Sequence, residues 1–422
     1  MSVTPKLLSA ATDALGLVLK FEFPADNVLS RYFQQHHALG QRDRAFVAEA
    51  VYGVLRHRRV LDALCGNDSN ARRLLLGWLA RFSGMSAREL APALGSDESQ
   101  RLADMKGVAL GELPPAVRAE LPDWIYGRLA STLGEADVLA LGHALQDPAP
   151  LDLRVNTLVT DRESARRSLG EHGIESEPTP FSPIGLRVRG KPALNRDPLF
   201  LNGSIEVQDE GSQLIGYLLA PTRHDLVVDF CAGAGGKTLM LGAMMASRGR
   251  VYAFDVSPAR LARLKPRLKR SGLSNLHPQL LRNENDIKVK RLAGKIDRVL
   301  VDAPCTGLGT LRRNPDLKWR QSAESVGELR VKQAAILKAA AGLVKQGGRL
   351  VYATCSLLSE ENEEIIDAFL AAHPDFVLQP ANEVLRQQGI ALDTGTYLRL
   401  WPQTHGTDGF FAAVLERSAT DA

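Results

Sequence analysis

The segment Phe230-Cys-Ala-Gly-Ala-Gly-Gly-Lys237 links the strand-like run Leu226–Phe230 to a helical pattern that begins at Lys237. Its glycines allow the backbone to approach a ligand closely, and the N-terminus of a helix presents free N–H groups. The next strand-like run ends at Asp255, where a doubly wound fold places the carboxylate that binds a ribose. The segment therefore predicts a nucleotide-type cofactor site in an α/β domain.

The glycine spacing indicates which cofactor fits. The segment lacks the Gly-x-Gly-x-x-Gly spacing of dinucleotide-binding loops. Lys237-Thr238 resembles the end of a P-loop, but the preceding glycines are misplaced for one. S-adenosylmethionine, which carries a ribose but no phosphate, fits the segment better. We therefore expect residues 231–237 and Asp255 to bind S-adenosylmethionine.

Strand and helix patterns alternate from about residue 207 onward. Such alternation predicts an α/β fold with a doubly wound, mostly parallel sheet and helices on both faces. We expect this domain to span residues 207–418. The expected strands are Leu226–Phe230, Val251–Asp255, Arg298–Asp302, Arg349–Thr354 and Phe410–Leu415, and the expected helices are Lys237–Ala246, Pro258–Ser271, Val326–Val344 and Glu360–His373.

Two smaller parts are expected before this domain: an all-helical domain over residues 1–145 and a small α+β module over residues 147–205. The Pro-rich sequence Asp147-Pro-Ala-Pro150 separates them as a linker would. Apolar residues recur at helical spacing in three segments of the first part, Leu7–Leu19, Arg44–Leu64 and Arg72–Phe82. The second part contains two strand patterns and one helical pattern, Leu151–Val155, Gly185–Val188 and Arg162–His172.

Cations cluster on the expected helical domain. Such a cluster is either a solvated helix face or a surface that faces RNA, and both interpretations carry equal weight here. The formal net charge of +4 permits nucleic-acid binding without requiring it. The clustered residues are Arg42, Arg44, Arg56, His57, Arg58 and Arg59.

Composition argues against several classes of protein. The 422 residues have ordinary apolar and charged fractions, and no stretch approaches the ~20 apolar residues of a membrane span. The first residues lack the pattern of a signal peptide. Four cysteines occur without a Cys-x-x-Cys pair, which argues against a zinc site or a disulfide framework. We expect a cytoplasmic monomer that binds neither a membrane nor a metal.

Two cysteines follow apolar, strand-like runs, one in Val301-Asp-Ala-Pro-Cys305 and the other in Val351-Tyr-Ala-Thr-Cys355. Ligands gather at the carboxyl ends of strands in open α/β sheets, so both thiols and Asp302 should meet at the edge of the cofactor site. A single cysteine would be better explained as a buried structural residue. Two at neighbouring strand ends favour covalent chemistry on an electrophilic carbon.

Thiols beside a methyl donor suit the methylation of a pyrimidine at carbon 5. Carbon 5 is a poor nucleophile, but addition of a thiolate to carbon 6 produces an enamine whose carbon 5 can attack a methyl group. A carboxyl group near nitrogen 3 stabilises the charge that builds on the ring. A base then removes the proton from carbon 5, and the thiolate leaves. The chain supplies two thiols and one strand-end carboxylate for these steps.

Six motifs resemble those of the Nop/Sun family of RNA cytosine-5 methyltransferases, over about residues 147–417. They are Phe230 to Lys237, Asp302-Ala-Pro-Cys305-Thr-Gly, Arg313-Asn-Pro-Asp316-Leu-Lys-Trp319, Tyr352-Ala-Thr-Cys355-Ser, Gln208-Asp-Glu-Gly-Ser212 and Asp408-Gly-Phe-Phe411. The resemblance implies a class I S-adenosylmethionine-dependent methyltransferase fold for residues 207–418. It makes the small module similar to the family's RNA-recognition-like subdomain. The helical domain is similar to the NusB-like RNA-binding domain of bacterial small-subunit rRNA enzymes.

The resemblance also implies roles for individual residues. Cys355 would be the nucleophile, because the Thr-Cys-Ser cysteine attacks in the RNA enzymes, whereas the Pro-Cys cysteine attacks in DNA enzymes. Cys305 would assist release of the methylated base. Asp302 would contact the cytosine near the methyl donor, and Lys237 would orient the base or Asp302.

The expected cofactor ligands depart from the family pattern at one position. The family places an Asp after the third strand, near the adenine, where this chain has Arg282-Asn-Glu-Asn-Asp286. Asn283 matches best by spacing, because an amide can still hydrogen-bond the adenine, and Asp286 is the alternative. The residues expected to hold S-adenosylmethionine are Cys231, Ala232, Gly233, Ala234, Gly235, Gly236, Lys237, Asp255, Asn283 and Asp302.

Two charged stretches follow the two cysteines. The cations after Cys305, in a loop with Trp319, are expected to contact RNA phosphates: Arg312, Arg313, Lys318 and Arg320. The acids after Cys355 are expected to be N-terminal helix residues that the helix dipole favours, rather than a metal site: Glu360, Glu361, Glu363 and Glu364.

The sequence thus predicts an RNA cytosine-5 methyltransferase that uses S-adenosylmethionine, acts on 16S rRNA and forms a covalent cysteine–cytosine intermediate. Two alternatives remain: the same chemistry on tRNA, and an RNA-binding ribosome assembly factor without catalysis. Intact Asp302, Cys305 and Cys355 argue against the second alternative. Amino-group methylation of adenine is disfavoured, because that chemistry uses an Asp/Asn-Pro-Pro-aromatic motif and Pro304 is followed by a cysteine.

Overall fold

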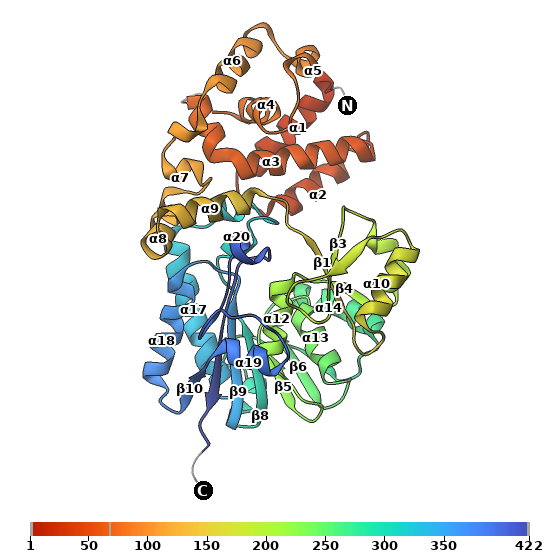
Figure 1. The fold of residues 1–422 in the computed structure, drawn as a ribbon, viewed down its shortest axis with the longest axis vertical. Coiled ribbons are helices and arrows are strands. Elements are labelled where there is room, and N and C mark those ends of the chain that lie inside the picture. The colour runs from red at the N-terminus through yellow and green to blue at the C-terminus, as the bar shows by residue number, and fades with distance from the viewer. Residues whose placement is uncertain (1–2, 67–68, 420–422) are drawn as a thin grey trace. The chain divides into compact units, whose positions relative to one another are not determined.

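The computed structural model describes residues 3–66 and 69–419. The chain forms two compact units, one of Met1–Pro148 with Thr310–Ala323 and one of Ala149–Gly309 with Glu324–Ala422 (Figure 1). Within the described ranges, no helix combines the length and the apolar character that crossing a bilayer requires. The domain boundaries expected from the sequence stay a proposal.

The first unit is helical. Helix α1 (Pro5–Val18) shows why: the Thr4 hydroxyl accepts a hydrogen bond from Leu7 N, a proline opens the helix, and Leu8, Ala11 and Leu15 are buried at helical spacing. The other helices are α2 (Ala25–Gln35), α3 (Gln41–Cys65), α4 (Ala71–Arg81), α5 (Ala87–Leu90), α6 (Ser96–Gly107), α7 (Pro115–Arg118), α8 (Asp123–Leu133), α9 (Glu135–Gln146) and α16 (Leu317–Arg320).

A segment from late in the sequence, Thr310–Ala323, belongs to this helical unit. The Lys318 ammonium is buried and donates to the backbone carbonyls of Arg56 at 2.8 Å and Glu120 at 2.7 Å. The Trp319 indole donates to Leu55 O at 3.0 Å and packs against the helical core. The segment is therefore a structural part of the helical unit.

This packing corrects the expected role of the basic loop. Phosphate contact is wrong for Lys318, which is 5 % exposed, and for Arg312, which is 6 % exposed, because neither side chain can reach a phosphate from there. The sequence gives no sign of this, since lysine and arginine are ordinarily exposed. For Arg313 and Arg320, which keep part of their surface exposed, phosphate contact stays a prediction.

Three arginines of the cation cluster on α3 make contacts within the helical unit. Arg56 donates to the backbone carbonyl of Arg312 at 2.9 Å, Arg58 lies 5.0 Å from the centre of the Trp319 ring, and Arg59 pairs with Asp123. These three arginines therefore contact other residues of the helical unit, and contact of the cluster with RNA stays a prediction.

The second unit begins with a small α+β module. Its four-stranded sheet has the order β2-β3-β1-β4, and every pair is antiparallel. One face of the sheet and helix α10 enclose an apolar core that includes Leu153, Leu169 and Leu186. The elements are β1 (Leu151–Val155), α10 (Arg162–Glu171), β2 (Ser176–Pro178), β3 (Gly185–Val188), α11 (Pro198–Leu201) and β4 (Ile205–Val207).

The rest of the second unit is built around a larger sheet of order β10-β12-β9-β8-β5-β6-β7, with β11 paired to β12. The five strands from β9 to β7 are parallel, and β12 joins them antiparallel. The strands are β5 (Leu226–Asp229), β6 (Arg250–Asp255), β7 (Leu276–Leu280), β8 (Ile296–Asp302), β9 (Val344–Thr354), β10 (Phe376–Gln379), β11 (Leu398–Leu400) and β12 (Phe410–Arg417).

Helices cover both faces of this sheet. Successive residues of one strand enter opposite cores, as Leu300 and Val301 of β8 do, which explains why the strands are apolar throughout. The predicted doubly wound, mostly parallel sheet is confirmed. The helices are α12 (Glu210–Leu219), α13 (Gly236–Met244), α14 (Pro258–Ser271), α15 (Ile287–Lys290), α17 (Ala323–Ala341), α18 (Glu363–Ala372), α19 (Ala381–Gln387) and α20 (Pro402–His405).

Candidate active site

Four acidic or thiol side chains gather at the carboxyl edge of the parallel strands. Asp229 ends β5, Asp255 ends β6, Asp302 ends β8 and Cys355 follows β9. Strand β8 pairs with both β5 and β9, so these strand ends are neighbours. A cavity of about 460 Å³ opens there, and all four side chains line it together with Cys305. The expectation that strand ends bring Asp302, Cys305 and Cys355 together agrees with this placement, whereas Asp229 was not expected there.

The glycine segment forms the turn between β5 and α13. Gly233 and Gly235 have φ values of 56° and 85°, in the region that favours glycine. A Cβ atom on Gly235 would also lie 2.1 Å from Leu264 Cδ1, so this glycine permits the turn to pack on α14. Asp255 Oδ2 accepts a hydrogen bond from Gly233 N at 2.8 Å, and its Oδ1 accepts one from Ser257 N at 2.7 Å. The Asp255 carboxylate therefore fixes the glycine turn between β5 and α13 and the loop between β6 and α14.

The cavity has the chemistry that a nucleoside-type cofactor needs. Asp255 and Glu284 offer carboxylates, while Leu281, Pro304 and Ile336 provide apolar surface. From the glycine segment, the lining residues are Cys231, Ala232, Gly233, Ala234, Gly236 and Lys237. The residues present fit S-adenosylmethionine.

The loop after β7 places its side chains differently from the expected pattern. Glu284 lines the cavity, whereas Asn283 accepts a hydrogen bond from Asn285 N and Asp286 caps α15. Sequence spacing alone missed Glu284, because the neighbouring amide matched the family position better. The cavity wall also includes Lys332, on α17, which no motif indicated.

Lys237 and Asp302 form an ion pair in the wall of the cavity. The ammonium donates to Asp302 Oδ2 at 2.8 Å, and the Lys237 side chain is 10 % exposed. Burial by itself lowers the pKa of Lys237, but the charge and hydrogen bond of Asp302, with a further contribution from Cys355, raise that pKa overall. Lys237 is therefore a fixed positive charge beside Asp302 and Cys355.

The thiols of Cys305 and Cys355 lie 3.4 Å apart, Sγ to Sγ. Both cysteines are free, and the separation exceeds the ~2.05 Å length of a disulfide bond. The hydrogen bond with Cys355 and burial raise the pKa of Cys305 well above its ordinary value. Burial also raises the pKa of Cys231. Cys305 and Cys231 therefore stay protonated at neutral pH.

The Asp408-Gly-Phe-Phe411 motif contacts the loop that follows Cys305. Gly309 N donates to Cys355 O and Gly409 N donates to Gly309 O, both at 2.8 Å. A Cβ atom on Gly309 would lie 2.1 Å from Gly409 O, so the two glycines permit this close approach. Through Gly409, this motif therefore fixes the position of the loop that follows Cys305.

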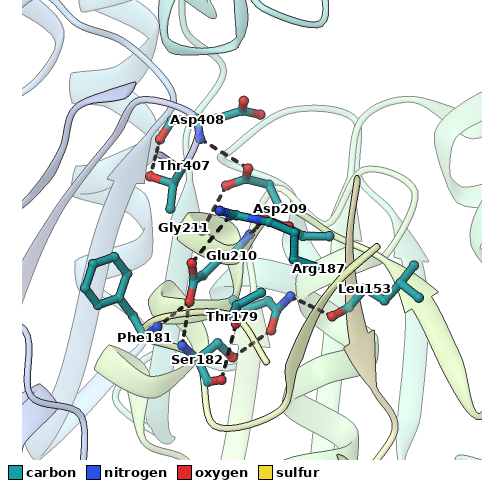
Figure 2. A network of polar contacts seen from close by, with 12 residues as sticks. Leu153, Thr179, Phe181, Ser182, Arg187, Asp209, Glu210, Gly211, Thr407 and Asp408 are labelled. Atoms are coloured by element: carbon teal, nitrogen blue, oxygen red, sulfur yellow. Dashed lines mark hydrogen bonds and ion pairs between the residues drawn. The ribbon is translucent and has the colours of Figure 1, made fainter. Parts of the chain in front are cut away.

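The motif Gln208-Asp-Glu-Gly-Ser212 joins the small module to the larger sheet (Figure 2). Glu210 Oε1 accepts hydrogen bonds from Phe181 N at 2.5 Å and Ser182 N at 2.7 Å. Asp209 Oδ2 accepts one from Asp408 N at 3.1 Å. Gln208, which directly follows β4 of the small module, lines the cavity.

Glu361 corrects the expectation for the acids after Cys355. Helix α18 begins at Glu363, and Glu361 ends a short 3₁₀ turn, Ser359–Glu361, with its side chain fully buried. The interpretation as an N-terminal helix residue favoured by the dipole is therefore wrong for Glu361. Across the described residues, 3–66 and 69–419, no cluster of His, Cys, Asp or Glu is arranged to hold a metal ion.

Asp229 is expected to make stability depend on pH. Burial raises the pKa of this carboxyl to about 7, while Thr238 donates to it at 2.6 Å. The folded state then binds a proton that the unfolded state releases near pH ~3.9, so the free energy of unfolding falls as the pH rises through about 7. Asp229→Asn should lose less thermal stability than wild type between about pH 5 and about pH 8. Parallel pH profiles in thermal melts would contradict this.

The sheet order, the glycine turn and the strand-end carboxylates define a class I S-adenosylmethionine-dependent methyltransferase fold. A family model described as 16S rRNA methyltransferase RsmB/F matches residues 216–416, and a model of the RsmF/B-like ferredoxin-like domain matches residues 121–195. A Synechocystis protein named probable ribosomal RNA small subunit methyltransferase B is 33 % identical, over 91 % of this chain and 93 % of its own length. The chain belongs to the RsmB/F methyltransferase family, and its cofactor is S-adenosylmethionine.

Solved structures agree with this fold. The crystal structure of PH0851 matches with a TM-score of 0.80 at 28 % identity, over 99 % of this chain and 100 % of the other. NSun6 from Pyrococcus horikoshii with SFG matches with a TM-score of 0.62 at 21 % identity, over 70 % of this chain and 98 % of the other. The first similarity extends over both units of the chain.

Proposed function

We propose that the protein methylates carbon 5 of a cytosine in 16S rRNA through a covalent bond between Cys355 and carbon 6. One observation carries the proposal: two thiols 3.4 Å apart lie beside the Lys237–Asp302 ion pair in the cofactor cavity. A methyltransferase acting on a nitrogen or oxygen atom has no use for such a pair, whereas a pyrimidine carbon must first be activated by a nucleophile.

The two thiols are suited to different tasks. Cys305 stays protonated because its hydrogen bond with Cys355 and its burial raise its pKa, so it can donate to the neighbouring sulfur. Cys355 lies close enough to the Lys237 ammonium to interact with it electrostatically, on the side of the cavity where the cofactor is expected. We therefore assign attack to Cys355 and assistance with release to Cys305.

The remaining groups of the site would position the cytosine and stabilise the charge that develops on it. Asp302, held by Lys237, would contact and orient the cytosine ring, and the Lys237 ammonium would stabilise the negative charge that develops on the ring when the Cys355 thiolate adds to carbon 6. S-adenosylmethionine, when bound by the glycine segment and Asp255, supplies an electrophilic methyl group for carbon 5. Transfer of the carbon 5 proton to a base, with cleavage of the bond between carbon 6 and sulfur and departure of the Cys355 thiolate, then restores the aromatic base.

The assignment to small-subunit rRNA rests on the relatives, which carry that name. Bisulfite sequencing of total RNA from cells with and without the protein tests the proposal directly. We expect one or a few cytosines of 16S rRNA to lose protection when the protein is absent. Loss of protection in tRNA would support the tRNA alternative, and unchanged profiles would favour an assembly factor without catalysis. We further propose that residues 1–145 and 147–205 carry most of the RNA affinity.

Asp255→Ala is expected to weaken S-adenosylmethionine binding. The variant removes both the hydrogen bond that fixes Gly233 N and the carboxylate at the ribose position, and losing a charge-assisted hydrogen bond costs about 10- to 100-fold in affinity. Calorimetry on the full chain measures this, with Asp161→Ala, an exposed cap of α10, as the control. Equal affinity in wild type and Asp255→Ala would remove Asp255 from the cofactor site.

A further inference from the structure

Glu361 connects the two loops that carry the cysteines. Its Oε1 accepts hydrogen bonds from Thr306 N and Gln333 Nε2, both at 2.9 Å. Its Oε2 accepts one from the Thr306 hydroxyl at 2.5 Å and another from the Ser356 hydroxyl. Each of the two carboxylate oxygens therefore has two polar partners, which matches the roughly four acceptor positions of a carboxylate.

The partners of Glu361 are the residues next to the two thiols. Thr306 follows Cys305 directly, and Ser356 follows Cys355 directly. The two hydroxyls also lie 3.1 Å from each other. The same carboxylate therefore sets the position of both loops, although the loops are 50 residues apart in the sequence.

The surrounding contacts make this arrangement rigid. Gln333 of α17 donates to Glu361 and also to Pro304 O at 3.0 Å. The Tyr352 hydroxyl donates to the backbone carbonyl of Glu361 at 2.7 Å. A charged group held by this many fixed donors moves little, and it keeps the groups bonded to it in place.

We propose that Glu361 is a positioning residue that holds the two cysteine loops in register and whose charge acts on Cys305. The inference rests on the function proposed above, in which Cys355 attacks and Cys305 stays protonated. The charge of Glu361 acts in the same direction as the hydrogen bond with Cys355 and as burial, which raise the pKa of Cys305 more strongly.

Several titratable groups surround Cys305. Cys355 and Tyr352 face it from β9 and the loop that follows, and Glu361 faces it from the 3₁₀ turn. Other charged groups line the cavity that also contains Cys305: Asp229, Lys237, Asp255, Arg260, Glu284, Asp302 and Lys332. Among the groups that raise the pKa of Cys305, Glu361 lies in a buried network next to the thiols and does not itself line the cofactor cavity.

The Glu361→Gln variant removes the charge of the side chain but keeps its shape, so it tests the effect of the charge alone. Glutamine has nearly the same shape, its carbonyl can accept from Thr306 N and Gln333, and the two hydroxyls can rotate to accept from its amide. Glu361→Ala removes both charge and shape. Glu364→Gln is the matched control, because Glu364 lies on α18, directly after the turn that holds Glu361, and pairs with Arg330 at the surface.

The first readout is the pH dependence of alkylation of Cys305 by iodoacetamide in the full chain, followed by peptide mass spectrometry. This measurement needs no RNA, so it holds whether or not the proposed function is correct. We expect the alkylation midpoint of Cys305 to move to lower pH in Glu361→Gln and to stay at the wild-type value in Glu364→Gln. An unchanged midpoint in Glu361→Gln would overturn the electrostatic part of the proposal.

The second readout is single-turnover methylation, together with affinity for S-adenosylmethionine. We expect Glu361→Ala to lose at least about 100-fold in rate, the scale of an ångström-sized misplacement, while cofactor affinity changes less than about 2-fold. Glu361→Gln should show a methylation optimum at lower pH. Rates and pH profiles equal to wild type in both variants would overturn the positioning role. If Glu361→Ala does not fold, Glu361→Gln decides the question alone.

Discussion

Cys355→Ala is expected to lose at least about 10⁴-fold in methylation rate, on the scale seen when a nucleophile is removed. Without the thiol at this position, nothing adds to carbon 6, and carbon 5 remains unreactive toward a methyl donor. The variant should also form no protein–RNA complex that survives denaturing electrophoresis. Methylation assays with tritiated S-adenosylmethionine and gels with labelled rRNA fragments measure both effects, with Cys65→Ala, in the helical unit, as the control.

Cys305→Ala should behave in the opposite way. Attack by Cys355 and methyl transfer remain available, but release of the methylated base is blocked, so a covalent complex should accumulate. The complex should require S-adenosylmethionine to form. An adduct from Cys355→Ala and none from Cys305→Ala would reverse the two roles and align the enzyme with the cytosine methyltransferases that act on DNA.

Trp319→Ala is expected to reduce the free energy of unfolding of the helical unit by about 2–4 kcal/mol. The indole packs on the helical core, lies 5.0 Å from the Arg58 guanidinium and donates to Leu55 O. Its truncation leaves a cavity and an unpaired carbonyl. Urea unfolding followed by circular dichroism measures the loss.

Asn314→Ala serves as the control, because Asn314 is exposed in the same segment and its change should stay within about 0.5 kcal/mol of wild type. If Trp319→Ala matched the control, the 310–323 segment would not be a structural part of the helical unit. A catalytic fragment that begins at residue 207 would carry this segment without the helices that bury Lys318, so RNA affinity is better compared in full-length variants.

Much of the sheet follows from the sequence, because its central strands are apolar on both faces and end in chemically distinctive residues. Cys305 and Cys355 meet for this reason: β8 and β9 are adjacent and parallel, so their carboxyl ends lie together. The expected strand and helix segments of this domain agree with the observed ones to within a few residues, except that β9 begins earlier, at Val344.

Other elements were not predicted, because their sequence patterns are too weak to identify a strand or a buried charge. Strand β7 contains Pro278, which is tolerated because the strand lies at the edge of the sheet. Strand β11 (Leu398–Leu400) has only three residues, too few for a periodic pattern. Lys318 and Glu361 appear in the sequence as surface charges, and only long-range partners make them buried ones. Burial of a charge depends on the tertiary structure, which no local window contains.

The most direct test of the account identifies the residue that bonds to RNA. Cys305→Ala is incubated with S-adenosylmethionine and 16S rRNA, the complex is digested with nuclease and protease, and the cross-linked peptide is sequenced by mass spectrometry. The account predicts a peptide in which Cys355 carries a methylated cytosine nucleotide. A cross-link at any other residue, or a trapped complex without the added methyl group, would contradict it.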